Sequence, residues 1–142
     1  MEYKLLEQED LPFMLNFVDD EETTYDVSSL SKFIQQPNTY AFILKHNDQI
    51  LAFAYGYVLY HPDDRKSFYF DAIDVLTEHQ DKGYGTGLMA FIRDYAKKLG
   101  CYEMFLVTNK SNISACKCYE KSGAHSDSND DIVYVYDFEG EK

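Results

Sequence analysis

The segment Gln80-Asp81-Lys82-Gly83-Tyr84-Gly85-Thr86-Gly87 is the part of this sequence whose residue types point most directly to chemistry. Its glycines stand at every second position, between an apolar run that ends at Val75 and a helical pattern that starts near Tyr84. Glycine leaves the neighbouring backbone N–H groups unshielded, and the start of a helix carries unpaired N–H donors and about half a positive charge. Such a loop attracts phosphate, so the segment predicts a cradle for a diphosphate group.

The elements that must position this loop follow from local residue patterns. Strands are expected where β-branched and aromatic residues gather between turn-forming residues, over residues 3–6, 39–45, 49–60, 68–75, 102–108 and 132–138. Helices are expected where apolar residues recur at helical spacing, over residues 11–18, 27–36, 84–99 and 112–121. Asp10 is predicted to cap the first of these helices, and Gly100 to follow the end of the third.

These elements predict a single domain that spans residues 1–142. The length suffices to bury a core, and the sequence contains no repeat, linker or low-complexity segment. A strand–helix–strand–helix unit among hairpins predicts an α/β (α+β) fold, in which a mixed sheet carries helices on both faces. Residues 102–108 are expected to form a buried, central strand and residues 132–138 the final strand.

Composition and charge exclude several classes of protein. Hydrophobic residues make up 45% of the chain and aromatic residues 16%, which argues against a disordered protein. The formal net charge of −12 would repel nucleic acid and anionic membranes, whereas it would attract a cationic partner. The apolar runs are too short to span a membrane, and the rich supply of tyrosine and phenylalanine is compatible with a homodimer.

The three cysteines, Cys101, Cys116 and Cys118, indicate a reducing compartment. An odd number of cysteines without a secretory leader does not fit a disulfide-stabilised scaffold, so a cytoplasmic location is expected. Cys116 and Cys118 stand two positions apart in an expected helix, where their side chains point in different directions. No metal site is therefore predicted.

Together with a later segment, the glycine loop resembles a known family. Gln80, Gly83 and Gly85 match the Q/R-x-x-G-x-G/A signature of the GNAT superfamily of acetyl-CoA-dependent N-acetyltransferases. The residues that match its second signature, N-x-x-A-x-x-x-Y-x-K-x-G, are Asn112, Ala115, Tyr119, Lys121 and Gly123. Because the expected order of strands and helices also agrees, the resemblance covers essentially the whole chain.

Shorter matches make the chain most similar to the aminoglycoside 3-N-acetyltransferase-like branch of that superfamily. They are Tyr57-Val58-Leu59, Asp71, Glu78-His79 and Val135-Tyr136-Asp137-Phe138. One residue departs from the family pattern, because Asp81 stands where the superfamily usually has glycine. Its carboxylate would weaken the local attraction for phosphate unless it points to solvent or Lys82 offsets its charge.

The resemblance implies a GNAT-like fold with a central, mostly antiparallel twisted sheet. In such folds the strand that carries Val75 splays from the next strand, and acetyl-CoA binds in the resulting V-shaped gap. Its pantetheine arm would pair with the backbone around Asp74 and Val75 as an added strand, while its diphosphate meets the start of the following helix. The cofactor-binding residues so implied are Asp74, Val75, Gln80, Asp81, Lys82, Gly83, Tyr84, Gly85, Thr86 and Asn112.

Acetyl transfer to an amine requires a neutral amine, a donor for the oxyanion and a proton for the departing thiolate. Tyr119 stands where the superfamily has its thiolate-protonating tyrosine, and a phenol can deliver that proton. By the same resemblance, a backbone N–H near Val75 supplies the oxyanion donor. For the base we expect Asp71, acting directly or through a water, with Asp74 as the alternative. Either carboxylate could instead bind ammonium groups of the substrate, and a bulge in their strand would alter which way they point.

The expected substrate is a small amine with several positive charges, for example an aminoglycoside. The acidic residues that the fold would bring to the acceptor side are Asp19 to Glu22, Asp130-Asp131 and Asp137. Glu22, Asp74 and Asp137 are the residues expected to bind this substrate, whereas His79 and His125 are interpreted as ordinary surface or loop histidines. The alternatives are a polyamine or protein amine as acceptor, or a module that binds acyl-CoA without catalysis.

Overall fold

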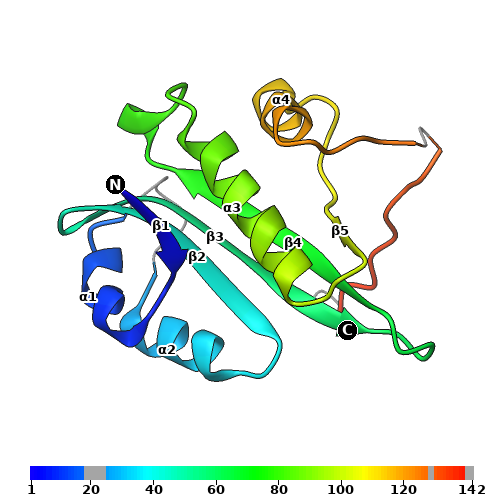
Figure 1. Ribbon diagram of the computed structural model, residues 1–142, viewed down its shortest axis with the longest axis horizontal. Helices are drawn as coiled ribbons and strands as arrows, with labels where there is room; N and C mark the ends of the chain where they lie inside the picture. The colour runs from blue at the N-terminus through cyan, green and yellow to red at the C-terminus, as the bar shows by residue number, and fades with distance from the viewer. Residues whose placement is uncertain (18–24, 128–129, 140–142) are drawn as a thin grey trace.

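The computed structural model describes residues 1–17, 25–127 and 130–139, and within them the chain forms one sheet with helices on both faces (Figure 1). The strands are Glu2–Leu5 (β1), Thr39–His46 (β2), Gln49–Tyr60 (β3), Lys66–Val75 (β4) and Glu103–Phe105 (β5). They lie side by side in chain order, with β1 to β4 antiparallel to their neighbours and β5 parallel to β4. The mixed, mostly antiparallel α/β fold predicted from the sequence is confirmed.

Helices cover both faces of this sheet in the described part of the chain. The α-helices are Leu11–Met14 (α1), Val27–Gln35 (α2), Tyr84–Lys98 (α3) and Ile113–Lys121 (α4), and short 3₁₀ turns occupy Gln8–Asp10 and Thr77–His79. α1 and α2 pack on one face, whereas α3 crosses the other face and contacts α4 (Figure 1). None of these helices combines the length and the apolar character that crossing a membrane requires.

Two hydrophobic clusters hold the layers together, one on each face of the sheet. Successive residues of a strand point to opposite faces, so Phe42 and Leu44 of β2 join the cluster under α3. Ala41 and Ile43 of the same strand join the cluster under α1 and α2. α3 completes the first cluster with a buried stripe at helical spacing, formed by Leu88, Met89, Ile92 and Ala96. The amphipathic pattern of α3 therefore fixes which of its faces meets the sheet.

β4 is paired on both sides over only part of its length. β5 pairs with it at Ser67, Phe68 and Tyr69, after which the two strands separate. β4 continues to Val75 while it stays paired with β3. Over residues 70–75, the backbone edge of β4 that faces away from β3 is therefore not paired with β5. This is the V-shaped splay that the family resemblance implies.

Two expected strands differ from the structure. Residues 102–108 form only the short strand β5, which is the edge of the described sheet and not a buried, central strand. Residues 132–138 form no strand, and they are irregular and exposed. Both errors have one cause, because a run of apolar residues predicts that a strand can form but not which neighbour it pairs with.

Asp10 stands at the predicted N-cap position of α1, but its side chain is a buried ion-pair partner and does not cap the helix. Its carboxylate makes no capping hydrogen bond to α1; instead its oxygens lie 2.9 Å from Lys4 Nζ and 2.8 Å from Lys45 Nζ, and the Glu7 N–H donates to it at 3.0 Å. Burial alone would raise the pKa of Asp10. Hydrogen bonds from Lys45, from Lys4 and from the Glu7 N–H outweigh burial and hold this pKa below its ordinary value.

Asp10→Asn is expected to lower the free energy of unfolding by about 3 kcal/mol, because it leaves two lysines without their buried partner. Urea denaturation at neutral pH measures the loss. Since the pKa of Asp10 is lowered in the folded protein, this stabilisation is present above the ordinary carboxyl pKa and disappears as the pH falls through the lowered value. Asp63→Asn, at the exposed ion pair with Arg65, is the control and should change stability little. Equal losses in the two variants would contradict the role assigned to Asp10.

Candidate active site

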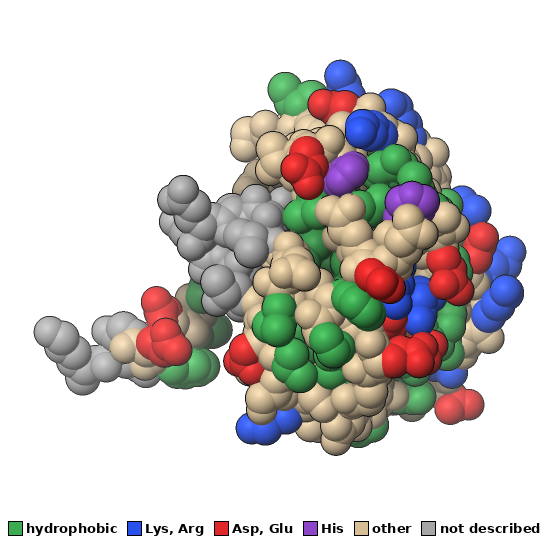
Figure 2. All heavy atoms as spheres, turned by 90° about the vertical axis from the view of Figure 1, so that its left-hand side faces the viewer, with side chains coloured by type: hydrophobic (Ala, Val, Ile, Leu, Met, Phe, Trp, Pro, Cys, Tyr) green, Lys and Arg blue, Asp and Glu red, His purple; other side chains and the backbone are tan. Residues whose placement is uncertain are grey.

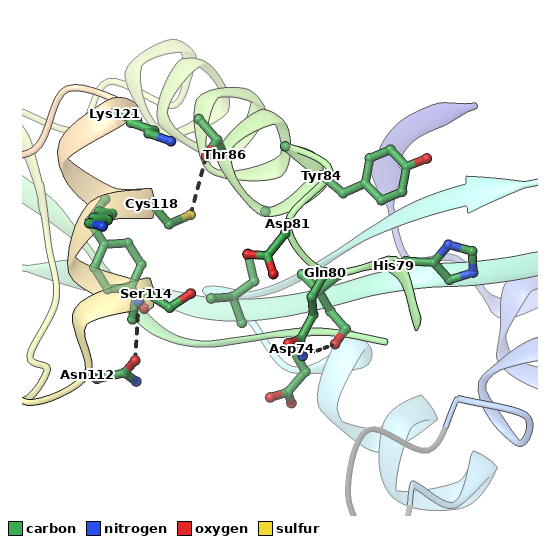
Figure 3. Close-up of a pocket in the computed structure, with 17 residues that line it drawn as sticks. Asp74, His79, Gln80, Asp81, Tyr84, Thr86, Asn112, Ser114, Cys118 and Lys121 are labelled. Carbon is green, nitrogen blue, oxygen red and sulfur yellow. Dashed lines mark hydrogen bonds between the residues drawn. The ribbon is translucent and has the colours of Figure 1, made fainter. Parts of the chain in front are cut away.

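A cavity of about 490 Å³ lies between the end of β4, the start of α3 and one face of α4 (Figure 3). β4, the loop after it and α3 supply Ile73, Asp74, Val75, His79, Gln80, Asp81, Gly83, Tyr84, Gly85 and Thr86. α4 and its cap supply Asn112, Ser114, Ala115, Lys117, Cys118, Tyr119 and Lys121. The two signature segments therefore line one cavity, and every residue expected to bind the cofactor except Lys82 lies in its wall.

The start of α3 presents free backbone donors to this cavity. Gly83 is the N-cap residue, and no side chain caps the helix. The N–H of Gly87 donates to the Gly83 carbonyl at 3.0 Å, so the N–H groups of Tyr84, Gly85 and Thr86 precede that bond and have no acceptor within the helix. Gly83 has a φ of 83°, and a Cβ at this position would point into open space. Because residues 83–86 line the cavity and no side chain caps the helix, these donors are placed to bind an anionic group there.

The other two glycines of the loop differ in how much space surrounds them. A Cβ on Gly85 would lie 3.4 Å from Cys118 Sγ and 3.6 Å from a methyl group of Val75, which are ordinary van der Waals contacts. A Cβ on Gly87 would collide with the ring and hydroxyl of Tyr3. Gly87 does not line the cavity, and the cradle is accordingly confined to residues 83–86.

Charges of both signs surround this cradle. Asp81, which stands where the family usually has glycine, has a φ of 62° and lines the cavity. Its left-handed backbone explains why glycine suits the position, since few other residues adopt it readily. Lys82, one of the two features that could have offset its effect, does not line the cavity, but Lys117 and Lys121 do so from α4. In Figure 3 the side chain of Lys121 extends toward Thr86 at the start of α3.

The backbone at the end of β4 offers a further donor. The Leu76 N–H donates to Leu51 of β3 at 3.0 Å. Because N–H groups alternate sides along a strand, the N–H of Val75 points away from β3, toward the side from which β5 has separated. Gln80, expected to donate to phosphate, instead donates through Nε2 to the Val75 carbonyl at 3.0 Å and ties the loop to the strand (Figure 3).

Tyr119 lies in the wall of the cavity that α4 provides. Its ring packs edge-on against Phe70 with the ring centroids 6.1 Å apart. Burial raises the pKa of Tyr119, and the nearby Cys118, Cys116 and Asp74 raise it further. The phenol therefore stays protonated at neutral pH and can donate a proton.

Asn112 caps the same helix, because its Oδ1 accepts a hydrogen bond from the Ala115 N–H at 3.2 Å. This leaves the amide N–H groups of Asn112 available to a ligand.

The two candidate bases on β4 have different surroundings. Asp74 lines the cavity, and its carboxylate accepts a hydrogen bond from the Tyr25 hydroxyl at 3.1 Å. Asp71 is the extra residue of a β-bulge, because Tyr55 pairs with Ala72 while the next residue of β3 pairs with the residue before Asp71. Asp71 is exposed and does not line the cavity. Three positions apart, the two carboxylates would point to opposite faces of a regular strand, but with the extra residue both of their charges act on the Tyr55 hydroxyl. Of the two, Asp74 is the one that also lines the cavity.

Asp71 belongs to an aromatic surface on the face of the sheet that α2 partly covers. Burial raises the pKa of the Tyr57 hydroxyl, and the charge of Asp71 and a hydrogen bond to its carboxylate raise it further. Tyr57 stacks on Tyr69 with the centroids 6.3 Å apart, and Tyr69 packs against Phe105 of β5 at 5.2 Å. These rings and Asp71 form the Asp71 surface.

The remaining residues expected to bind substrate are not in the cavity wall. Asp137 lies on the exposed C-terminal segment, and Asp130 and Asp131 precede it there. Glu22, with Asp19 to Asp20 and Glu21, lies outside the described residues. Of the acidic residues proposed for the acceptor, Asp74 is thus the one that the structure brings to the cavity.

Several cavity residues were missed or undervalued in the sequence. His79, interpreted as an ordinary loop residue, lines the cavity, and its Nδ1 is buried without a hydrogen-bond partner among the described residues. Ser114, Lys117 and Cys118 follow Asn112 on one face of α4. Helical spacing from Asn112 to Tyr119 and Lys121 is the signal that could have identified this face.

The chemistry of the cavity wall suits an anionic, hydrogen-bonding ligand such as a nucleotide diphosphate. The wall combines the free N–H groups at the start of α3, the lysines of α4 and the unpaired imidazole nitrogen of His79.

Comparison with known proteins gives a family and a set of structural neighbours. The family model described as the Acetyltransferase (GNAT) family matches residues 4–124 of the chain. The search of curated proteins found no match to this chain.

Three solved structures illustrate the likeness in fold. An aminoglycoside acetyltransferase, meta-AAC0020, from an uncultured soil metagenomic sample in complex with sisomicin has a TM-score of 0.80 at 20% identity, over 95% of this chain and 93% of that one. The aminoglycoside N-acetyltransferase AAC(6')-Iy in complex with CoA has a TM-score of 0.78 at 15% identity, and the match covers 96% of this chain and 94% of that one. A ribosomal-protein-alanine N-acetyltransferase from Brucella melitensis biovar Abortus 2308 has a TM-score of 0.74 at 18% identity, and the match covers 95% of this chain and 100% of that one. At these identities the likeness shows the fold.

Asp81→Asn is expected to tighten the binding of coenzyme A by about two- to fivefold, because it removes a negative charge near a helix N-terminus. Asparagine tolerates the left-handed backbone, so the substitution changes the charge and little else. Isothermal titration calorimetry measures the affinity. Asp64→Asn is the matched control, since Asp64 also has a positive φ, of 71°, but lies in the turn before β4. Identical affinities for Asp81→Asn and the unmodified protein would show that this carboxylate does not act on the ligand.

Proposed function

Since the chain belongs to the GNAT acetyltransferase family, we propose that it transfers an acetyl group from acetyl-CoA to a primary amine of a small polycationic acceptor, with an aminoglycoside as the leading candidate. The observation that carries this proposal is a single cavity with two chemically distinct parts. One part is the start of α3, which no side chain caps and which suits a diphosphate. The other contains Tyr119 and Asp74, which suit proton transfer.

The residues that would hold acetyl-CoA follow from the arrangement of donors. The N–H groups of Tyr84, Gly85 and Thr86 would bind the diphosphate, with Lys117 and Lys121 neutralising its charge. The unpaired edge at the end of β4 would bind the amides of the pantetheine arm as an added strand. When bound, acetyl-CoA supplies an acetyl group activated as a thioester.

Tyr119 is proposed as the general acid. Its raised pKa keeps the phenol protonated, so the proton is held at the Tyr119 oxygen until a thiolate leaves. The N–H of Val75, which points away from β3, is proposed to stabilise the developing oxyanion. The two groups approach the cavity from different elements, α4 and β4, so neither displaces the other.

Asp74 is proposed as the group that takes the proton of the attacking amine, directly or through a water. Its place in the cavity wall supports this role, and the Tyr25 hydroxyl fixes the orientation of its carboxylate. Asp71, on the sheet surface, is then proposed to attract and bind a positively charged part of the acceptor.

Charge and aromatic rings support the class of acceptor. The net charge of −12 favours the approach of a cation. The Asp71 surface offers aromatic faces and a carboxylate together, which suits a sugar or other ring that carries ammonium groups. A structural neighbour in complex with sisomicin is consistent with this class of acceptor. A peptide or polyamine amine is the alternative acceptor.

The proposed activity is tested by following thiol release from acetyl-CoA in the presence of aminoglycosides, polyamines and peptides. Turnover with aminoglycosides in preference to the other amines is the expected result. Turnover with peptides alone would overturn the proposed acceptor class while leaving the reaction intact. Thermal stabilisation by acetyl-CoA without turnover of any amine would show a binding module and overturn the proposed enzyme.

Tyr119→Phe is expected to lower kcat by about 100-fold or more, because the thiolate would leave without its proton donor, while the affinity for coenzyme A stays nearly unchanged. Because the pKa of Tyr119 is raised, kcat of the unmodified enzyme should show no alkaline loss from this group until the pH exceeds the ordinary tyrosine value of 10.0. Steady-state kinetics against pH measure both effects. Tyr102→Phe, at an exposed tyrosine before β5, is the control that should retain full activity. An unchanged kcat in Tyr119→Phe would remove the assigned role.

Asp74→Asn and Asp71→Asn are expected to affect different kinetic constants. Asp74→Asn should lower kcat by about 100-fold, because the amine loses its proton acceptor. Asp71→Asn should raise KM for a cationic acceptor and change kcat little, since this carboxylate would act in binding. Kinetics with one amine acceptor and both variants decide between the roles. The opposite pattern would return the role of base to Asp71.

A further inference from the structure

The bulge in β4 changes which of its residues face α3. Before the bulge, Phe68 and Phe70 belong to the hydrophobic cluster under α3, and after it Ile73 and Val75 pack on the same cluster. Ile73 and Val75 line the cavity, whereas Phe70 is 1% exposed and does not line it. The part of β4 that is not paired with β5 therefore runs from an open cavity wall to a buried ring at its inner end.

This inner end of the splay is filled by side chains. β5 pairs with β4 up to Tyr69, so Phe70 is the first residue beyond the last pair. The Phe70 ring packs edge-on against Tyr119 of α4, and Leu106, which follows β5, packs on the same cluster. On the outer face drawn in Figure 2, by contrast, hydrophobic side chains are scattered among polar and charged ones. Tyr119 thus forms the cavity wall at the inner end, and Phe70 supports its ring from behind.

The proposed position of acetyl-CoA directs its acyl group toward this end. The diphosphate would lie at the start of α3, which follows the end of β4 in the chain. The pantetheine arm would then extend along β4 from Val75 toward Phe70, with its sulfur near Tyr119. An acyl chain continues beyond the sulfur, so it would meet the Tyr119 ring and the Phe70 ring behind it.

We propose that Phe70 sets the size of the acyl group that the cavity accepts, because it holds the Tyr119 ring in place and so leaves room for an acetyl group but not for a longer chain. Phe70 is buried in a closely packed cluster, and an extra methylene group in such a place must displace its neighbours or be excluded. This inference rests on the proposed binding of acetyl-CoA in the cavity and makes the acyl group a second point of selection, besides the amine.

Isothermal titration calorimetry with a series of acyl-CoA thioesters tests the size limit without any amine. The unmodified chain should bind coenzyme A and acetyl-CoA with similar affinity. It should bind butyryl-CoA at least about 10-fold more weakly than acetyl-CoA, because the two additional methylene groups find no space. Equal affinities for acetyl-CoA and butyryl-CoA would overturn the proposal.

Phe70→Leu and Phe68→Leu form a matched pair of variants. Both remove a ring from a fully buried position in the same cluster, but the Phe68 ring packs against Tyr40 and Phe42. Phe70→Leu should bring the affinity for butyryl-CoA to within about threefold of that for acetyl-CoA, whereas Phe68→Leu should keep the original difference. The same relaxation in both variants would show a general loosening of the core and would overturn the role assigned to Phe70. Phe70→Met, which changes the volume less, replaces Phe70→Leu if that variant does not fold.

The size limit and the proposed transfer can fail separately. A chain that binds acetyl-CoA in preference to butyryl-CoA but acetylates no amine would keep the size limit and lose the proposed transfer. A chain that binds both thioesters equally and transfers both acyl groups would keep the transfer and lose the size limit.

Discussion

The unpaired backbone N–H groups at the start of α3 are the feature on which the chemistry of the cavity depends. Their residues line the cavity, no side chain caps the helix, and glycine at the N-cap position, residue 83, adopts the positive φ there without strain. The separation of β4 from β5 after Tyr69 gives them space to receive a ligand. Had β5 stayed paired along all of β4, residues 70–75 would have no free edge, and the family's way of binding an extended arm would be blocked.

The fold can keep these donors unpaired because its stability comes from other places. Both hydrophobic clusters lie on the faces of β2, β3 and β4, and the buried Asp10 is matched by Lys4 and Lys45 far along the chain from the cavity. The charges at the cavity are less well matched. Asp81 opposes the helix N-terminus while Lys117 and Lys121 support it, so the affinity for an anionic ligand reflects a balance between opposite charges.

Local patterns predicted most of the fold and much of the site. β3 was predicted at Gln49–Tyr60 and α3 from Tyr84, because alternation and helical spacing depend only on nearby residues. The edge position of β5, the irregular backbone of residues 132–138 and the ion pairs of Asp10 depend on contacts between distant segments, and no local pattern encodes them. The same limit applies to the site. The glycine loop and Tyr119 were found through their motifs, and helical spacing from Asn112 could have added Lys117. His79 joins the cavity through the fold of the turn after β4, which no motif in the sequence indicates.

A titration of the labelled protein with coenzyme A, followed by the NMR signals of the backbone amides, tests the central claim most directly. The account predicts that the N–H signals of Gly83, Tyr84, Gly85 and Thr86 move strongly with coenzyme A and hardly at all with pantetheine, which has no diphosphate. Amides elsewhere that respond to the diphosphate, while these remain still, would contradict it.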